Sequence, residues 1–182
     1  MNTNLTATTF LALSQSPLLR EVWSRYLEEK TEDETANPEE VVSLDASCLP
    51  IEDLSDFTIF KNLRTLDLSF SAVRDLSPLA DMPFLEELHL TFHIGGVLLG
   101  LEKLAHLRIL DLSYPRSAIR ELDRVSDLDN LEELYMNGCG VRTVAHVVPL
   151  EKLRILTLSF NCIPKAERDA FRVLSPACAL LD

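Results

Sequence analysis

The chain has 182 residues, of which 47% are hydrophobic, a size that fits one well-buried core rather than two large domains. Its net charge is −12, so its surface repels phosphate backbones, and no direct binding to nucleic acid is expected. The acids are concentrated at the front: residues 1–62 carry 12 acids and 4 bases, whereas residues 63–182 carry 17 acids and 13 bases. A partner protein with a basic patch fits this charge better.

The first 16 residues, MNTNLTATTFLALSQS, contain no basic side chain and only a short apolar run. Neither a signal peptide nor a transit peptide is therefore expected, and no apolar stretch is long enough to span a membrane. The cysteines show no CxxC spacing and are interpreted as buried thiols in a reducing compartment. These features favour an intracellular protein, cytoplasmic or nuclear. The cysteines are Cys48, Cys139, Cys162 and Cys178.

A helix is predicted in the segment SPLLREVWSRYLEEK, because Ser16 followed by Pro17 is a helix-start signal. One face of this helix is apolar and is expected to cap the first repeat; the alternative is that the face docks in a partner's groove. An acidic linker follows, so residues 1–38 are predicted to form a capping helix and linker. The apolar face consists of Leu18, Leu19, Val22, Trp23, Tyr26 and Leu27.

From Val41 onward the sequence repeats itself in six units with the pattern L-x-x-L-x-L. The spacing between unit starts is 22 residues, except for one spacing of 24. Self-similarity at this period is typical of a solenoid, and the pattern is that of the leucine-rich repeat. The units start at Val41, Leu63, Leu85, Leu107, Leu131 and Leu153.

Each unit alternates apolar and polar residues, as a strand with one buried face does. In the fourth unit, Leu110 and Leu112 are predicted to point inward, while Ile109, Asp111 and Ser113 point outward. Stacking then buries a continuous core, with one parallel strand from each coil. The predicted fold is an α/β solenoid of about six coils with a parallel concave sheet. The return side of each coil is expected to bury residues such as Leu76, Leu79 and Phe84.

Two units depart from the regular pattern. In the third, Gly95 and Gly96 stand where the pattern usually has Val-Arg-Asp, and glycine permits a turn that other residues resist. No Gly-Lys-Ser/Thr follows, so this is not a phosphate-binding loop. The fourth inserts two residues around YPRSA, and its loop is expected to bulge past its neighbours. A second alternation, of charge, runs along the strand entrances and is interpreted as surface decoration that sets register. It consists of Arg64, Glu86, Arg108, Glu132 and Arg154.

The end of the chain carries a more specific signal. The residues Asn161 to Pro164, Phe171-Arg172, Pro176 and Leu181-Asp182 resemble the C-terminal cap of short intracellular leucine-rich repeat proteins. That group includes a regulator of type-1 protein phosphatase, the axonemal dynein light chain and the A-prime protein of a spliceosomal particle. The resemblance implies a repeat domain over 39–182 with a cap from about 161.

In that family, asparagine at the ninth repeat position bonds to neighbouring backbones. This chain departs from the pattern, because only its last repeat, at Asn161, has asparagine there. The other residues at this position are Leu49, Ser71, His93, Pro115 and Cys139.

Candidate catalytic residues are scarce. His89 and His93 are four apart, but one falls in a strand and the other in the loop that follows, so a metal site is not expected. Ser69 and Ser113 recur as repeat positions on the strand surface, which argues for a structural role. Adjacent acids such as Glu132-Glu133 point to opposite sides of a strand and make a poor acid/base pair. The sequence therefore predicts a protein that is not an enzyme and needs no cofactor.

The concave face is the candidate interface. Its outward positions are rich in acids, and a ridge of aromatic residues runs along its exit edge, a combination that protein interfaces use. The alternative is that the rings only pack on one another. The candidate protein-binding residues are Asp45, Asp67, Phe70, Glu87, His89, Phe92, Asp111, Tyr114, Glu133 and Tyr135.

These observations predict a non-catalytic protein–protein interaction module or scaffold subunit that acts as a monomer within a hetero-complex. Its partner is expected to be a basic protein, with no direct nucleic acid and no membrane. The alternatives are a structural subunit of a large ribonucleoprotein or axonemal assembly, or, as the resemblance implies, a regulatory subunit of a protein phosphatase. For a structural subunit, the convex side and the N-terminal helix should carry contacts as well.

Overall fold

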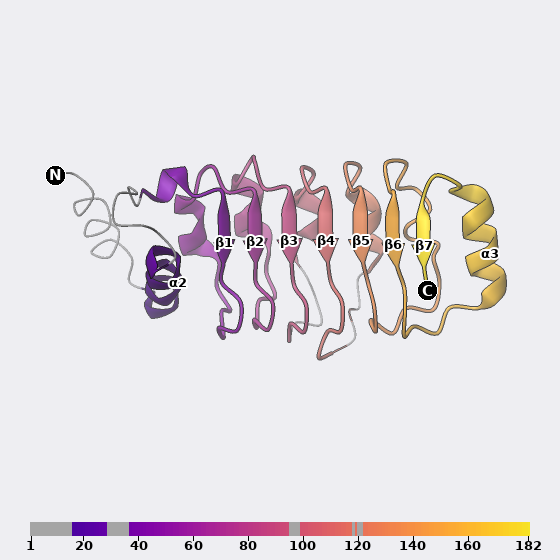
Figure 1. Cartoon of the computed structure of the whole chain (residues 1–182), viewed down its shortest axis with the longest axis horizontal. Coiled ribbons are helices and arrows are strands. Elements are labelled where there is room, and N and C mark those ends of the chain that lie inside the picture. The colour runs from indigo at the N-terminus through magenta and orange to yellow at the C-terminus, as the bar shows by residue number, and fades with distance from the viewer. Residues whose placement is uncertain (1–15, 29–36, 95–98, 118, 120–121) are drawn as a thin grey trace.

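The computed structural model describes residues 16–28, 37–94, 99–117, 119 and 122–182. Over these ranges the chain winds into stacked coils that share one sheet of seven parallel strands in chain order (Figure 1). The predicted α/β solenoid is therefore confirmed. The strands are β1 (Ser43–Asp45), β2 (Thr65–Asp67), β3 (Glu87–His89), β4 (Ile109–Asp111), β5 (Glu133–Tyr135), β6 (Ile155–Thr157) and β7 (Ala179–Leu181).

Several predictions concern residues outside these ranges. They are those for the first 15 residues, for most of the acidic linker, and for Gly95 and Gly96.

The strands pair so that each leucine lies beside the equivalent leucine of the next coil. Leu88 of β3, for example, pairs with Leu66 of β2 and with Leu110 of β4, and all three are fully buried. Burial of a leucine side chain contributes about 1.5–3 kcal/mol. The 22-residue period thus sets the register, and the two inserted residues of the fourth unit are taken up outside the sheet, in a loop that extends below β4 (Figure 1).

The return side of the coils consists of short 3-10 helical segments that lie behind the sheet (Figure 1). Leu76 and Leu79 are buried there, as predicted. The described segments are Pro38–Glu40, Ser55–Ile59, Ser77–Asp81, Leu101–Lys103 and Leu122–Asp127.

The prediction that Phe84 is buried is wrong, because 46% of its surface is exposed. Phe84 immediately precedes Leu85, the first leucine of its unit, and its side chain lies at the turn by which the coil enters the sheet. The other coils place polar residues at this turn. They are Asn62, His106, Asn130 and Lys152.

The prediction that the strand-end serines lie on the surface is also wrong for Ser69 and Ser113, which are buried. Both residues follow a strand, where the chain bends toward the interior. Ser113 Oγ accepts hydrogen bonds from the backbone N–H (3.2 Å) and the side-chain amide (3.4 Å) of Asn137 in the next coil. A small hydroxyl at this position therefore links two coils.

Helix α2 (Pro17–Glu28) closes the N-terminal end of the solenoid. Ser16 Oγ accepts the backbone N–H of Leu19 at 3.2 Å and caps the helix, as predicted. Trp23 is fully buried, and its ring lies 5.9 Å from that of Phe60 in the first coil. The capping interpretation of this helix is confirmed, whereas the boundary between residues 38 and 39 stays a prediction.

The C-terminal end is closed by helix α3 (Lys165–Leu174), which buries Phe171 against the last coil. The chain then returns to add β7, which was not predicted because its short sequence ALL lacks the L-x-L alternation. Asp182 forms an ion pair with Arg172 of α3, with 2.7 Å between Oδ1 and Nη2. This contact fastens the end of the chain to the helix.

The cysteines divide into two classes. Cys139 and Cys178 are buried, as predicted, and burial raises the pKa of the Cys139 thiol to about 12. Cys48 and Cys162 are exposed, contrary to the prediction. Cys48 has a positive φ of 59° and lies in the turn after its strand, so its side chain leaves the core.

We expect Leu110→Ala to lower the free energy of unfolding by about 2–5 kcal/mol, because it empties a central buried position. The matched control is Ile109→Ala, which removes an aliphatic side chain from the opposite side of the same strand, where Ile109 is half-buried. This control should cost about 1 kcal/mol. Urea denaturation measures both, and equal losses would contradict the assigned strand phase.

We expect Trp23→Ala to destabilise the chain by about 3–5 kcal/mol, because the indole covers the first coil. Arg20→Ala, on the exposed side of the same helix, should change stability by less than about 0.5 kcal/mol. Thermal unfolding of both variants checks this. Equal melting temperatures would show that α2 does not stabilise the solenoid.

Candidate functional site: the outer face of the sheet

The outward side chains of β1 to β6 form one surface, here called the sheet face. Neighbouring coils leave most of these side chains half-buried. Five of the twelve outward positions are acidic, and none of the twelve is lysine or arginine. The outward positions of this surface therefore carry an excess of negative charge. Its acids are Asp45, Asp67, Glu87, Asp111 and Glu133.

The aspartates of the sheet face have a structural task that sequence reasoning missed. In each case Oδ1 accepts the backbone N–H two residues on, at 2.8 Å: Ser47 for Asp45, Ser69 for Asp67 and Ser113 for Asp111. Such bonds stabilise the turn that ends the strand. The aspartates therefore combine negative charge with turn formation, and Asp111 is half-buried.

The two glutamates hold neighbouring rings. Glu87 Oε1 lies 2.9 Å from His89 Nε2, and Thr65 Oγ1 donates to its other oxygen at 3.1 Å. The hydroxyl of Tyr135 donates to Glu133 Oε2 at 2.6 Å, which raises the pKa of Tyr135 to about 12. These bonds fix the orientation of both rings across the centre of the face.

An aromatic row lies along the edge where the chain leaves the strands. It consists of Phe70, Phe92, Tyr114 and Phe160, all of which have positive φ between 54° and 63°. Their backbone still continues the ladder: Phe70 N donates to Thr91 O at 2.8 Å. Asparagine and glycine adopt this conformation more readily than rings do. The left-handed turn directs each ring out of the coil.

The rings of the aromatic row stack along the solenoid. The centroids of Phe70 and Phe92 are 5.0 Å apart, and those of Phe92 and Tyr114 are 5.4 Å apart. Gly138 occupies the next position, so Tyr114 leans across it to lie 6.2 Å from Phe160. Two of the rings remain widely open to solvent, with 49% of Phe70 and 82% of Phe160 exposed. The row is therefore both packed and accessible.

The structure brings the predicted interface residues together on one continuous surface. Seven of them lie on the sheet face, and Phe70, Phe92 and Tyr114 form most of the aromatic row. Sequence reasoning missed the role of Gly138, whose missing side chain lets two rings meet. The signal was present, since Gly138 interrupts an otherwise aromatic position.

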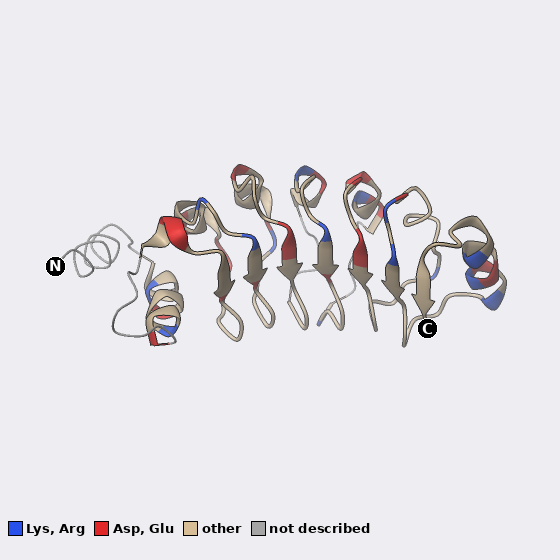
Figure 2. Cartoon of the chain, turned by 45° about the horizontal axis from the view of Figure 1, so that its top comes forward, with Lys and Arg blue, Asp and Glu red and all other residues tan. Residues whose placement is uncertain are grey.

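The predicted charge ladder also forms, as the alternating blue and red strand entrances of Figure 2 show. Arg64 pairs with Glu86, and Arg108 contacts Glu86 at 3.5 Å and Glu132 at 3.0 Å. The guanidinium of Arg108 lowers the pKa of Glu132. The arginines are exposed and the glutamates half-buried, and ion pairs at such a surface contribute little to stability. That the ladder helps to set the register stays a prediction.

The ninth repeat position shows how the departures from asparagine are accommodated. Asn161 bonds as the family pattern implies: its Nδ2 donates to Met136 O at 2.7 Å and its Oδ1 accepts from Val141 N at 2.9 Å. His93 is buried and its Nδ1 lies 2.6 Å from Leu90 O. The thiol of Cys139 donates to Leu112 O at 3.2 Å. Chemically different side chains thus bond to backbone carbonyls at this position.

The two histidines that are four apart do not approach one another as ligands, since His89 lies on the sheet face and His93 is in the core. In the part of the chain that the structure describes, no group of three or more histidine, cysteine, aspartate or glutamate side chains could hold a metal ion. No helix within the same ranges is long and apolar enough to cross a membrane.

No protein-family model matches the chain, and no curated protein matches it by sequence. Solved structures do match. An internalin (InlF) from Listeria monocytogenes superposes with a TM-score of 0.69 at 16% identity, over 94% of this chain and 57% of the internalin. The functional domain of InlJ from the same bacterium gives 0.64 at 16% identity, over 95% and 42%. These likenesses confirm the leucine-rich repeat fold.

A third match is a complex with an RNA. The complex of TLR13 with the single-stranded RNA ssRNA13 superposes with a TM-score of 0.56 at 21% identity. It covers 78% of this chain and 24% of TLR13. This chain thus spans between about a quarter and three fifths of the lengths of these three proteins.

We expect Gly138→Ala to destabilise the chain more than Gly140→Ala. Both glycines have positive φ, 64° and 73°, so both substitutions cost about 1–2 kcal/mol in the backbone. A Cβ at Gly138 would also lie 2.7 Å from Cδ1 of Tyr114, whereas one at Gly140 meets nothing within 4 Å. Denaturation gives the difference, and near-ultraviolet circular dichroism should report a displaced Tyr114. Equal costs would mean that the ring moves freely.

Proposed function

We propose that this chain is a non-catalytic protein-binding module that uses the sheet face and the aromatic row together. The observation that carries the proposal is the exposed, stacked aromatic row beside a face with five acids and neither lysine nor arginine. Large rings that stay in water while in contact with one another supply area at little entropic cost on binding. Neighbouring carboxylates then select the partner by charge.

The partner's chemistry follows from that charge. Arginine fits best, because its guanidinium stacks on rings and also bonds to carboxylates in pairs. One solved neighbour is a complex with a single-stranded RNA. Here the acids of the sheet face would repel a phosphate backbone, so a basic segment of a protein is the better ligand.

A role as scaffold subunit within a hetero-complex is compatible with this surface. The alternatives, a ribonucleoprotein or axonemal subunit or a phosphatase regulator, are distinguished by which surfaces make contact. The apolar face of α2 is already used against the first coil, where Trp23 is fully buried. This contact favours the sheet face over the helix as the main interface.

The test uses variants that keep the turns intact. Asp67→Asn with Asp111→Asn removes two charges but retains the Oδ1 acceptors for Ser69 and Ser113. Phe92→Asn removes a ring at φ 56°, a conformation that asparagine tolerates. We expect proteins captured from native cells by the parent chain to bind both variants weakly, as quantitative mass spectrometry of the eluates would show.

The matched control is Glu52→Gln with Asp56→Asn, which removes the same charge from exposed acids away from the sheet face. With a purified partner, the aspartate variant should lose mainly association rate, in a salt-dependent way. Phe92→Asn should accelerate dissociation by about tenfold or more. If both variants fold by circular dichroism and bind like the control, the sheet face is not the interface.

A further inference from the structure

An exposed phenylalanine, Phe84, lies at the edge of the sheet where the chain enters the strands. The aromatic row lies at the opposite edge. Phe84 stands at a turn that is polar in the described coils on either side of it. In two of those coils the residue is asparagine, which bonds to the preceding coil: Asn62 Nδ2 donates to Glu39 O at 2.6 Å, and Asn130 Nδ2 donates to Ala105 O at 2.7 Å. Phe84 makes no such bond and leaves nearly half of its surface in water.

The charge ladder ends beside this ring. Arg64 N bonds to Val42 O at 2.8 Å and Glu86 N bonds to Arg64 O at 2.9 Å, so these residues are consecutive members of one row. The alternation calls for an acid at Val42, but a valine that is 53% exposed stands there. Arg64 therefore pairs with Glu86 on one side and meets an apolar side chain on the other.

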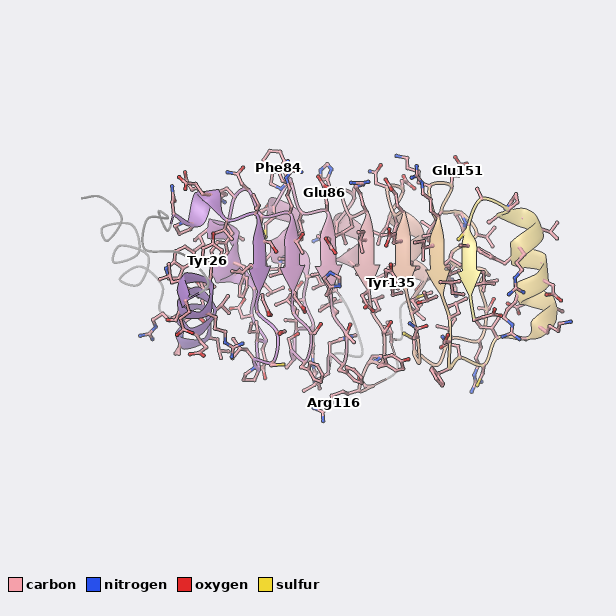
Figure 3. All side chains as sticks on the ribbon, in the orientation of Figure 1. Tyr26, Phe84, Glu86, Arg116, Tyr135 and Glu151 are labelled. Atoms are coloured by element: carbon pink, nitrogen blue, oxygen red, sulfur yellow. The ribbon has the colours of Figure 1, made fainter. Side chains whose placement is uncertain are left out.

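Between Val42 and Phe84 lies an open groove of about 380 Å³. The guanidinium carbon of Arg64 lies 5.7 Å from the centre of the Phe84 ring, within the range of a cation–π contact, and helps to hold that wall in place. Figure 3 shows Phe84 and Glu86 at this upper edge, away from Tyr135. The groove is lined by Glu39, Glu40, Val42, Asn62, Arg64 and Phe84.

We propose that this groove, here called the Phe84 groove, is a second binding site, for a partner-protein segment in which an aromatic or aliphatic side chain adjoins a lysine or arginine. The apolar side chain would lie between Val42 and Phe84. The cation would face the carboxylates of Glu39 and Glu40, which line the groove. Their backbone is the red segment to the upper left of β1 in Figure 2. The charge of Arg64 is offset in part by its ion pair with Glu86, a carboxylate that Arg108 shares.

The charge of the whole chain decides against a second copy as the occupant. At a net charge of −12, two copies repel each other, and the acidic mouth of the groove adds to that repulsion. The site is independent of the proposed function, because the Phe84 groove and the aromatic row lie at opposite ends of the strands. The two sites can therefore be removed separately.

The experiment is a titration of the full ¹⁵N-labelled chain, followed by NMR of its backbone amides. The probe is N-acetyl-tryptophan-arginine amide, and the control probe is N-acetyl-tryptophan-glutamate amide. We expect the arginine probe to shift resonances around Glu39, Asn62 and Phe84, and the glutamate probe to bind more weakly by about tenfold.

The decisive variant is Phe84→Asn, which places at this turn the residue that Asn62 and Asn130 show to be compatible with the coil. It should weaken the arginine probe by about tenfold, while Phe92→Asn should leave it unchanged. Equal binding to Phe84→Asn, shifts confined to the aromatic row, or an absence of shifts up to the solubility of the probe would overturn the proposal. Self-association that Phe84→Asn abolishes would overturn it as well, by assigning the groove to a second copy.

Discussion

In-register hydrogen bonding between successive coils places each side chain beside its counterpart one repeat away, at a spacing of about 4.8 Å. At each position of the repeat, the side chains of successive coils therefore form a column, and neighbours within that column must be compatible. Leucines satisfy this by packing, as Leu66, Leu88 and Leu110 do. Charges satisfy it by alternating in sign, and rings satisfy it by stacking. The core, the charge ladder and the aromatic row are three solutions to the same geometric condition.

At one place on the sheet face, two like charges are neighbours in the register, and neither alternation of charge nor stacking relieves them. Asp45 and Asp67 are direct neighbours in the register, and like charges in that arrangement repel. Their turn-forming bonds to backbone N–H groups offset part of this cost. Binding of a cationic side chain would offset the remaining repulsion between Asp45 and Asp67. This pair therefore supports the proposal of a basic partner. In the next coils His89 and Tyr135 interrupt the column of acids.

The period and the L-x-L alternation were sufficient to predict the solenoid and its register, because those depend only on which positions are apolar. The two caps were predicted from other signals, a helix start at Ser16 and a resemblance of the last residues to a family's C-terminal cap. The period and the alternation could not place Phe84, since hydrophobicity alone does not distinguish the outside of a turn from the inside of a coil. They also assigned Ser113 to the surface, because strand alternation was extended past the point where the chain bends. The candidate interface residues do lie on one surface, whereas their binding role stays a prediction. The turn-forming bond of Asp111 was missed because it depends on the backbone conformation beyond the strand.

The burial of Trp23 by the first coil also constrains when the N-terminal helix can fold during synthesis. Helix α2 is synthesised before Phe60, so a nascent chain carries the indole and its apolar neighbours uncovered until that coil has left the ribosome. Folding that proceeds from the N-terminus during translation thus has to wait for the first complete coil. During that interval the helix is a hydrophobic segment of the kind that chaperones recognise.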